Sequence, residues 1–259
     1  MKVGFIGFGN MAQALADGLV LKKALRPEDI YAYARTKEKL INNTVPKGFN
    51  PCSSAKDLVE AVDMVVIAVK PYSVEEVISD IRDYLEGKIL VSVVVNYTFS
   101  DYEKILGANA HHISTLPNTP VSVGEGVIMY ENRHSLTSDE LDKFKGIFSK
   151  LGLVQEVNTG NFGIAGTITG CGPAFASMFI EALSDAAVKH GLPRDLSYKL
   201  ASQMLAGTGK LQLASGDHPG IMKDRVCSPG GTTIVGVTTL ERKGFRSAVI
   251  DAVDEIMNR

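Results

Sequence analysis

The chain has 259 residues, of which 45% are hydrophobic and 22% are charged, and these ordinary globular values exclude the disordered and fibrous classes. Its 27 basic and 29 acidic residues give a formal net charge of −2 at pH 7. That balance predicts no nucleic-acid partner and no membrane-surface partner, since either needs a concentrated basic face.

Cysteine usage and hydropathy bear on the compartment. Only three cysteines occur, Cys52, Cys171 and Cys227, and they lack the spacing of metal ligands. So sparse a set does not form a disulfide framework, and we expect a cytoplasmic protein with no metal site. Glycines and polar residues interrupt the apolar N-terminus, which indicates a first strand and not a signal peptide. No apolar run approaches the roughly 20 residues of a membrane span, and we expect a soluble protein with no membrane partner.

Short apolar runs rich in Val, Ile and Met alternate with helix-like segments through the first half. We expect strands at residues 3–6, 30–33, 64–69, 89–95 and 153–157, and helices at 11–21 and 138–150. Nearly continuous β-branched runs fit strands that are buried on both faces, as in a parallel sheet covered by helices. The alternation predicts an α/β fold with a Rossmann-type doubly wound sheet.

The pattern changes after Asn158, beyond which we expect helices alone. They are expected at 173–189, 193–214 and 245–258, with Pro173 in the first turn of the first one. We therefore divide the chain into a dinucleotide-binding Rossmann domain, 1–158, and an all-helical domain, 159–259. Roughly 100 residues in a few helices make a thin core. Because apolar residues cover more than one face of these helices, we expect them to pack against a second copy of the chain.

The strongest local signal is the segment Gly7–Ala12, which directly follows the first expected strand and opens a helix. Its letters, GFGNMA, match the G-x-G-x-x-G/A fingerprint of dinucleotide sites. The first glycine permits a tight turn, the second lets the backbone approach a pyrophosphate, and Ala12 allows close packing of helix on strand. The helix N-terminus then offers N–H donors to the anion. The alternative is a glycine-rich turn with a purely structural role.

The end of the second expected strand bears on the choice of cofactor. An NAD site usually has Asp or Glu there to bind the ribose 2′-hydroxyl, whereas this chain has Ala34-Arg35-Thr36. Arg35 can pair with a 2′-phosphate that no carboxylate repels. We therefore expect NADPH to be preferred, with NADH as the alternative. The structural reading of the same residues is a solvated basic turn.

Two further turns offer polar groups. The segment Ala68–Pro71 ends the third expected strand at the carboxyl edge of the sheet, where Lys70 is either a surface residue or a ligand of the pyrophosphate. Pro117–Pro120 is a rigid polar turn. Its asparagine, Asn118, can exchange hydrogen bonds with a ligand or belong to an ordinary loop.

The late segment Cys227–Thr233 combines two glycines and two threonines before an apolar helix. Unblocked N–H groups and hydroxyls at a helix N-terminus suit a carboxylate. Because Ser and Thr are also preferred as ordinary helix caps, composition alone leaves both interpretations open.

Together these segments resemble the pyrroline-5-carboxylate reductase family nearly from end to end. The shared segments are 7–12, 68–71, 117–120 and 170–174, and the most family-specific are His218-Pro219, Lys223-Asp224, Cys227–Thr233 and Gly244–Ser247. The resemblance implies a Rossmann domain followed by a helical dimerisation and substrate-binding domain. It also implies a homo-oligomer with the active site between subunits, and reduction of 1-pyrroline-5-carboxylate to L-proline.

The resemblance further implies which residues form the site. Hydride would pass from nicotinamide C4 to the C=N carbon with no metal, Thr233 would lie beside the ring nitrogen as the catalytic group, and its loop would hold the substrate carboxylate. The expected cofactor contacts are Gly7, Phe8, Gly9, Asn10, Met11, Arg35, Thr36, Ala68, Val69, Lys70, Pro71 and Val95, and the expected substrate contacts are Asn118, Cys171, Gly230, Gly231, Thr232 and Thr233.

Three segments depart from the family pattern. Thr169–Pro173 has a thiol, Cys171, where the family usually has a hydroxyl, and Val94–Asn96 replaces Ala-Ala-Gly and puts bulk beside the nicotinamide. Thr159–Gly163 lacks the usual acidic residues. These departures bear on substrate fit and catalytic efficiency more than on fold or reaction type.

Two other interpretations stay open. One is a related imine or β-hydroxyacid-type dehydrogenase, of which the latter would carry a catalytic lysine on the long helix, whereas Lys189 lies at that helix's far end. The other is a non-catalytic nucleotide-binding relative, which gains some weight from the three departures. Oxidation of NADPH with pyrroline-5-carboxylate, compared with 2-hydroxy and 3-hydroxy acids, separates these interpretations.

Overall fold

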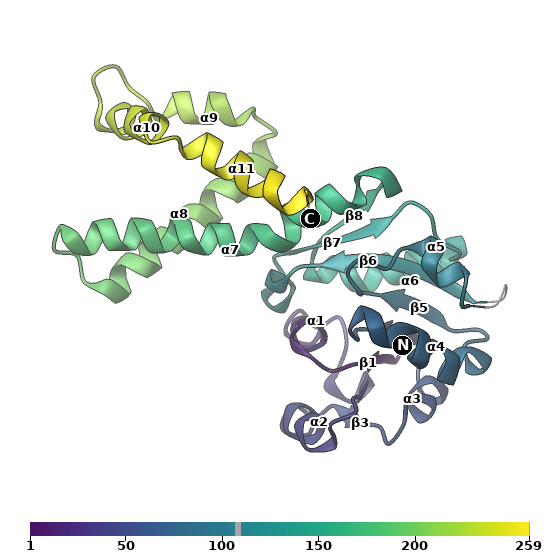
Figure 1. The fold of residues 1–259 in the computed structure, drawn as a ribbon. Coiled ribbons are helices and arrows are strands. Elements are labelled where there is room, and N and C mark those ends of the chain that lie inside the picture. Colours follow the sequence, from purple (N-terminus) through teal and green to yellow (C-terminus); the bar gives the residue numbers. More distant parts are fainter. Residues whose placement is uncertain (107–109, 259) are drawn as a thin grey trace. The chain divides into compact units, whose positions relative to one another are not determined.

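Eight strands form one sheet in the order β3-β2-β1-β4-β5-β6-β7-β8 (Figure 1). The computed structural model describes residues 1–106 and 110–258. Neighbouring strands are parallel except for the pair β6 and β7. The strands are β1 Val3–Ile6, β2 Ile30–Tyr33, β3 Asn50–Pro51, β4 Met64–Ile67, β5 Ile89–Ser92, β6 His111–Pro117, β7 Gly126–Glu131 and β8 Gly152–Val157. Because β2 and β4 flank β1, the order reverses there, as in Rossmann folds.

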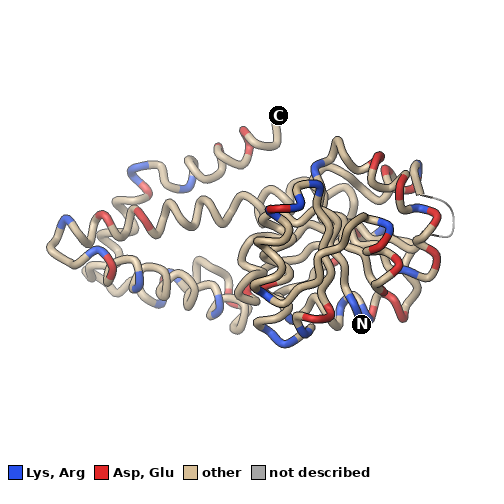
Figure 2. Tube along the Cα trace, turned by 90° about the horizontal axis from the view of Figure 1, so that it is seen from below, with Lys and Arg blue, Asp and Glu red and all other residues tan. Residues whose placement is uncertain are grey.

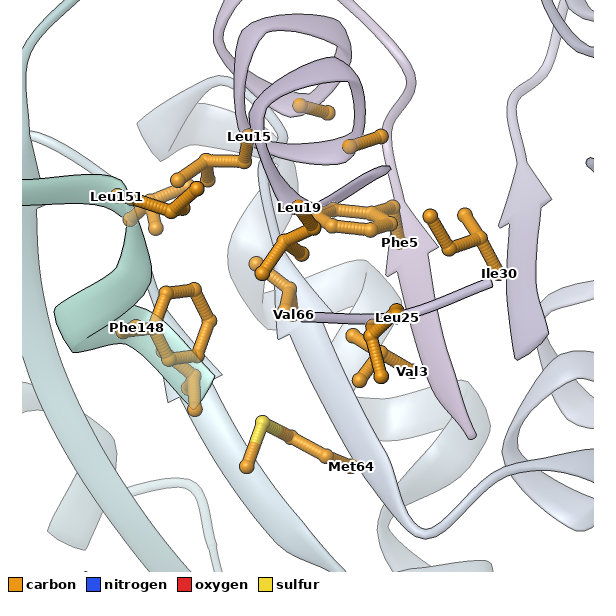
Figure 3. Close-up of a cluster of buried hydrophobic side chains, with 14 of the residues drawn as sticks. Val3, Phe5, Leu15, Leu19, Leu25, Ile30, Met64, Val66, Phe148 and Leu151 are labelled. Atoms are coloured by element: carbon orange, nitrogen blue, oxygen red, sulfur yellow. The ribbon is translucent and has the colours of Figure 1, made fainter. Parts of the chain in front are cut away.

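Helices cover both faces of the sheet, and each face has its own apolar cluster. Alternate residues of β4 point to opposite sides, so Met64 and Val66 belong to one cluster while Val65 and Ile67 belong to the other. Figure 3 shows the first cluster, where side chains of β1 and β4 meet Leu15 and Leu19. The helices that contribute to this first cluster are α1 Asn10–Leu21, α2 Lys37–Thr44 and α6 Ser138–Phe148. The helices that contribute to the second cluster are α3 Ala55–Ala61, α4 Val74–Ile81 and α5 Phe99–Glu103.

The predicted α/β fold class is confirmed. All five predicted strands occur, although the runs expected to reach residues 69 and 95 end at Ile67 and Ser92. The strands β3, β6 and β7 were not predicted. Strand β6 begins with two histidines and carries further polar residues, so it lacks the apolar run of a buried strand. Pairing with β5 and β7 nevertheless buries its central residues.

Helix α7 spans Thr159–Lys189 and contains Pro173 in its interior. The prediction that a helix begins at Pro173 was therefore wrong. Proline has no N–H group, so Pro173 cannot donate to the carbonyl of Thr169 one turn earlier. The side-chain amide of Asn118 donates to that carbonyl instead, at 3.0 Å.

The chain divides into two compact units, Met1–Gly170 and Cys171–Arg259. The division lies within α7, whereas the sequence-based boundary at residue 158 lies at the helix start. The reason is that the first turns of α7 pack on the sheet: a Cβ atom at Gly166 would lie 2.9 Å from Leu116 Cδ1. The assignment of 1–158 and 159–259 as domains stays a prediction, and Arg259 lies outside the described residues.

The described residues of the second unit form helices joined by loops, without a strand. After α7 it contains α8 Arg194–Ser215, α9 Pro219–Arg225, α10 Thr232–Arg242 and α11 Phe245–Met257. Many of its large apolar side chains are exposed, among them Met178 and Leu213. Figure 2 shows acidic and basic positions interspersed along the chain.

Helix α7 is also long and apolar. Its 31 residues include a stretch of mean hydropathy 1.3, and by length and composition alone it could cross a membrane. The expectation that no apolar run approaches a membrane span is corrected on this point. Gly, Ala and Thr interrupt the aliphatic residues, but no charged residue occurs from position 159 to 180. A core helix of a soluble protein meets the same criteria of length and composition but is mostly buried, whereas 6% of this stretch is buried within the described chain.

Candidate active site

The carboxyl ends of β1 and β4 lie side by side where the strand order reverses, the place at which open α/β sheets bind ligands. Gly7 follows β1 there with a φ of 88°, a conformation that favours glycine. A Cβ atom at Gly7 would lie 2.6 Å from the carbonyl oxygen of Ala68. Packing against the end of β4 therefore requires glycine at this position.

Gly9, in contrast, is not required by contacts within the described chain. It is exposed, and a Cβ atom added to it would meet nothing within 4 Å. Gly9 is the N-cap of α1, where no described side chain caps the helix and the first turn has no acidic residue. The open N–H groups and the helix dipole suit a pyrophosphate, whose approach a side chain at Gly9 would obstruct. The loop thus fits a dinucleotide.

The side chains around the two glycines point in different directions. Phe8 is 5% exposed, and its ring centroid lies 6.0 Å from that of Phe5 and 6.2 Å from that of Phe49. Met11 packs against the same apolar cluster, whereas Asn10 is exposed. Of these predicted cofactor contacts, Phe8 can therefore offer main-chain atoms only.

The turn after β4 lies against the fingerprint loop. The Ala68 N–H donates to the Ile6 carbonyl at 2.8 Å and so extends the pairing of β1 with β4. Lys70 is exposed and immediately precedes the short 3₁₀ helix Pro71–Ser73. Its ammonium group has no ion-pair partner in the described ranges, so it is available to a phosphate.

Arg35 extends from the end of β2, and its side chain is 69% exposed. Its Nη2 donates to Ser73 Oγ at 3.1 Å, and its Nη1 lies 3.9 Å from a carboxylate oxygen of Glu76. Sequence reasoning missed Ser73, because only the sheet order brings it near β2. Thr36 is the N-cap of α2, and its side chain makes no capping hydrogen bond to a described residue. A cation and an open helix end thus lie together.

A pocket of about 310 Å³ opens beside Arg35. Cys52 lines this pocket. Burial, and to a smaller extent the nearby carboxylate of Asp57, raises the pKa of its thiol, which therefore stays protonated at neutral pH. The mixed apolar and basic lining suits the adenosine end of a phosphorylated nucleotide. The lining residues come from the end of β2, from α2 and from β3 with the residues after it: Tyr33, Ala34, Arg35, Lys37, Leu40, Ile41, Pro51, Cys52 and Ser53.

The segment Val94–Asn96 follows β5 at the same edge of the sheet. Asn96 has a φ of 58°, and asparagine is among the few residues besides glycine that adopt this conformation readily. The turn can therefore form with asparagine in place of glycine. Val94 is buried and Val95 is 58% exposed, so only Val95 presents its side chain to a ligand.

Asn118 is 8% exposed, and both ends of its amide make hydrogen bonds within the chain. Its Oδ1 accepts from the Val127 N–H at 2.8 Å, while its Nδ2 donates to the Thr169 carbonyl at 3.0 Å. These contacts join the turn after β6 to helix α7. A direct contact with substrate stays a prediction.

The second unit holds the other predicted substrate contacts. Cys171 is a half-buried free thiol on α7. Gly230 has a φ of 71°, and a Cβ atom at Gly231 would lie 2.4 Å from Ser228 Oγ. The backbone of the loop thus favours glycine at position 230, whereas a side chain at position 231 would require the Ser228 hydroxyl to move. The loop leads into α10.

Thr232 and Thr233 are the first residues of α10, and both are exposed. Neither hydroxyl has a hydrogen-bond partner among the residues that the structure describes. Thr238, further along the same helix, instead donates to the Ile234 carbonyl at 3.0 Å. The two hydroxyls at the helix start are thus free to bind a ligand, next to N–H groups that no side chain caps in the described structure.

The first unit therefore gathers the fingerprint loop, the turn after β4, the end of β2 and Val95 at the carboxyl edge of its sheet. Gly230–Thr233 form a loop of the second unit. Within residues 1–106 and 110–258, no three or more His, Cys, Asp or Glu side chains are grouped to hold a metal ion.

Two family descriptions match the chain, one for each part. Residues 160–259 match the family described as pyrroline-5-carboxylate reductase dimerisation. Residues 2–96 match the family described as NADP oxidoreductase coenzyme F420-dependent. The two matches cover the loop Gly230–Thr233 and the fingerprint Gly7–Ala12 respectively.

Whole proteins of known identity are similar over nearly their full length. The pyrroline-5-carboxylate reductase of Treponema pallidum is 46% identical over 98% of this chain and 97% of its own length. The Escherichia coli enzyme of the same name is 36% identical over 100% of this chain and 96% of its own. The Plasmodium falciparum pyrroline carboxylate reductase, solved with NADP bound, has a TM-score of 0.87 at 34% identity and covers 98% of this chain and 95% of its own.

Proposed function

The chain belongs to the pyrroline-5-carboxylate reductase family, and we propose that it reduces 1-pyrroline-5-carboxylate to L-proline with NADPH. The observation that carries this proposal is the 46% identity to a reductase over 98% of the chain, which includes both the dinucleotide loop and the loop before α10. This step completes proline biosynthesis.

The first unit binds the cofactor in this proposal. NADPH supplies the hydride that reaches the C=N carbon. Gly9 and the open start of α1 accommodate the pyrophosphate, with Lys70 as an additional cation. Arg35 pairs with the 2′-phosphate, and the exposed Val95 side chain lies on the nicotinamide side. The exposed guanidinium of Arg35, beside the Ser73 hydroxyl and 3.9 Å from the Glu76 carboxylate, supports preference for NADPH over NADH.

The loop before α10 binds the substrate. The Thr232 N–H holds the carboxylate, since it lies at a helix start without an acidic residue in the first turn. The Gly231 N–H, which was expected to share this role, donates instead to the Ser228 carbonyl at 3.0 Å. The Thr233 hydroxyl hydrogen-bonds at the ring nitrogen, where positive charge favours hydride arrival at carbon. A protonated imine needs positioning more than a strong acid, and the hydroxyl provides that positioning.

The assembly and the compartment complete the proposal. The dimerisation match over residues 160–259 and the exposed apolar side chains of the second unit support a homo-oligomer. We place the active site between subunits and the protein in the cytoplasm, without a membrane or nucleic-acid partner.

A substrate comparison tests the function. Purified chain with NADPH and pyrroline-5-carboxylate should oxidise the cofactor and form proline. The same chain with NADP and a series of 2-hydroxy and 3-hydroxy acids should reduce the cofactor far more slowly. Faster turnover of a 3-hydroxy acid would indicate a β-hydroxyacid-type dehydrogenase. Tight NADPH binding without turnover of any imine would indicate a non-catalytic relative.

A further inference from the structure

Pro173 leaves a gap in the hydrogen bonding of α7. In an α-helix the N–H of position 173 would donate to the carbonyl of Thr169, but proline has no N–H. This carbonyl is partly buried, and leaving it without a donor is unfavourable. Asn118 supplies the donor, because its Nδ2 lies 3.0 Å from that oxygen.

The surroundings of Asn118 direct its amide to this carbonyl. Asn118 is the N-cap of the 3₁₀ helix Thr119–Val123, a position where asparagine commonly bonds to the helix that it precedes. Its side chain makes no such bond. The Val127 N–H, 2.8 Å from Oδ1, fixes the amide so that Nδ2 points at Thr169.

The α7 turn before this carbonyl is held on the same side of the sheet. A Cβ atom at Gly166 would lie 2.9 Å from Leu116, which comes two residues before Asn118. The Thr169 hydroxyl donates to the carbonyl of Ala165 at 2.9 Å within the same helix. The residues that follow directly are Gly170 and Cys171.

We propose that Asn118 is a positioning residue that bridges the gap at Pro173 and thereby sets the position of Thr169–Cys171 for substrate binding. The proposal rests on the proposed function and on the expectation, from the resemblance to the family, that Cys171 contacts the substrate. It differs from the expectation that Asn118 itself contacts substrate, because here Asn118 acts through the helix.

A double-mutant cycle between positions 118 and 173 tests the bridge. Asn118→Ala should raise KM for pyrroline-5-carboxylate about three- to tenfold, the range for one neutral hydrogen bond, while kcat and the Kd of NADPH change less. Pro173→Ala restores the helical N–H donor to Thr169. In that background Asn118→Ala should therefore raise KM less than about twofold, since the two positions share one acceptor.

Asn118→Asp isolates the same bond. It keeps the acceptor for the Val127 N–H but presents an oxygen to the Thr169 carbonyl, so KM should rise at least as much as with alanine. Equal effects of Asn118→Ala in the parent chain and in the Pro173→Ala background would mean that Asn118 contacts substrate directly, and the proposal would be wrong. Reduced stability with unchanged KM would leave Asn118 merely structural, which also overturns it.

The free energy of unfolding separates failure of this proposal from failure of the proposed function. If the parent chain does not reduce pyrroline-5-carboxylate, the function fails. The cycle measured by urea unfolding still reports the bridge: coupling between positions 118 and 173 supports it, and additivity overturns it.

Discussion

At the scale of single residues, Arg35 is exposed and shares only a long ion pair and one hydroxyl contact with its neighbours. We expect Arg35→Ala to lower kcat/KM for NADPH about tenfold, because an exposed charge-assisted contact contributes at the low end of its range. The value for NADH should change little.

Arg26→Ala is the matched control for Arg35→Ala. Arg26 lies before the other end of β2, where it pairs with Glu28 and Asp29. Its removal takes away the same charge and should leave the ratio of NADPH to NADH activity unchanged. A cofactor preference that is identical in Arg35→Ala and the parent chain would contradict the assignment of Arg35 to the 2′-phosphate.

Thr233 has a hydroxyl that no described residue uses. Thr233→Ala should lower kcat/KM for pyrroline-5-carboxylate by roughly ten- to several-hundred-fold, the effect of losing one positioned hydrogen bond of about 1.5–3 kcal/mol. Folding and the Kd of NADPH should change little. Thr233→Ser keeps the hydroxyl and should lose much less activity.

Thr238→Ala serves as the control in the same helix, because the Thr238 hydroxyl donates a hydrogen bond to the Ile234 carbonyl. This variant should keep its activity. Steady-state kinetics of the three variants decide the matter. Equal activity of the Ala and Ser variants at Thr233 would mean that its hydroxyl does not act on the substrate, and that the residue only forms the start of the helix.

At the scale of elements, the β1–α1 loop contains two glycines that are needed for different reasons. Gly9 leaves room for the cofactor, whereas Gly7 is needed for the loop to fold. Gly9→Ala should leave the free energy of unfolding within about 1 kcal/mol, since alanine is only a somewhat poorer N-cap and a Cβ atom there meets no described atom. It should raise the Kd of NADPH by roughly tenfold or more, because that Cβ atom occupies the path of the pyrophosphate.

Gly7→Ala should instead act mainly on stability and lower the free energy of unfolding more than Gly9→Ala does. Its φ of 88° and the approach of the Ala68 carbonyl make any side chain costly in the folded chain itself. Urea unfolding and fluorescence titration with NADPH distinguish the two variants. A Gly9→Ala variant that binds NADPH as tightly as the parent chain would argue against a pyrophosphate at this loop.

At the scale of the whole molecule, the second unit leaves large apolar side chains uncovered. Met178, on α7, is 68% exposed, and soluble proteins seldom leave such side chains gathered on helices without a partner. The dimerisation match covers the same residues. We therefore expect a homo-oligomer that Met178→Glu weakens.

Light scattering over a range of concentrations measures this effect, together with activity at each concentration. Leu21→Glu is the control, because Leu21 is 60% exposed on α1 of the first unit. It should leave the molar mass unchanged. A stable and active monomer of the parent chain at low concentration would contradict the prediction.

Features that depend on local periodicity and on backbone chemistry can be predicted from the residues alone. The run Val3–Ile6 followed by a glycine turn and a helix can be recognised within a short window, because strand and helix place apolar residues at different spacings. The same holds for the β-branched run of β4 and for the long helices of the second unit. The loop Gly230–Thr233 was identified as a ligand site by its composition and its resemblance to a family, not by periodicity, and that role stays a prediction.

Features that depend on residues far apart in the chain could not be predicted before the fold was known. Strand β6 is polar in sequence and becomes a buried strand because neighbouring strands satisfy its backbone. Arg35 meets Ser73, 38 residues away, because the strand order places β2 and the start of α4 near the same edge. Helix α7 continues through Pro173 with a donor from Asn118, 51 residues before Thr169. No local pattern contains these contacts, since the groups that satisfy one another are far apart in the chain.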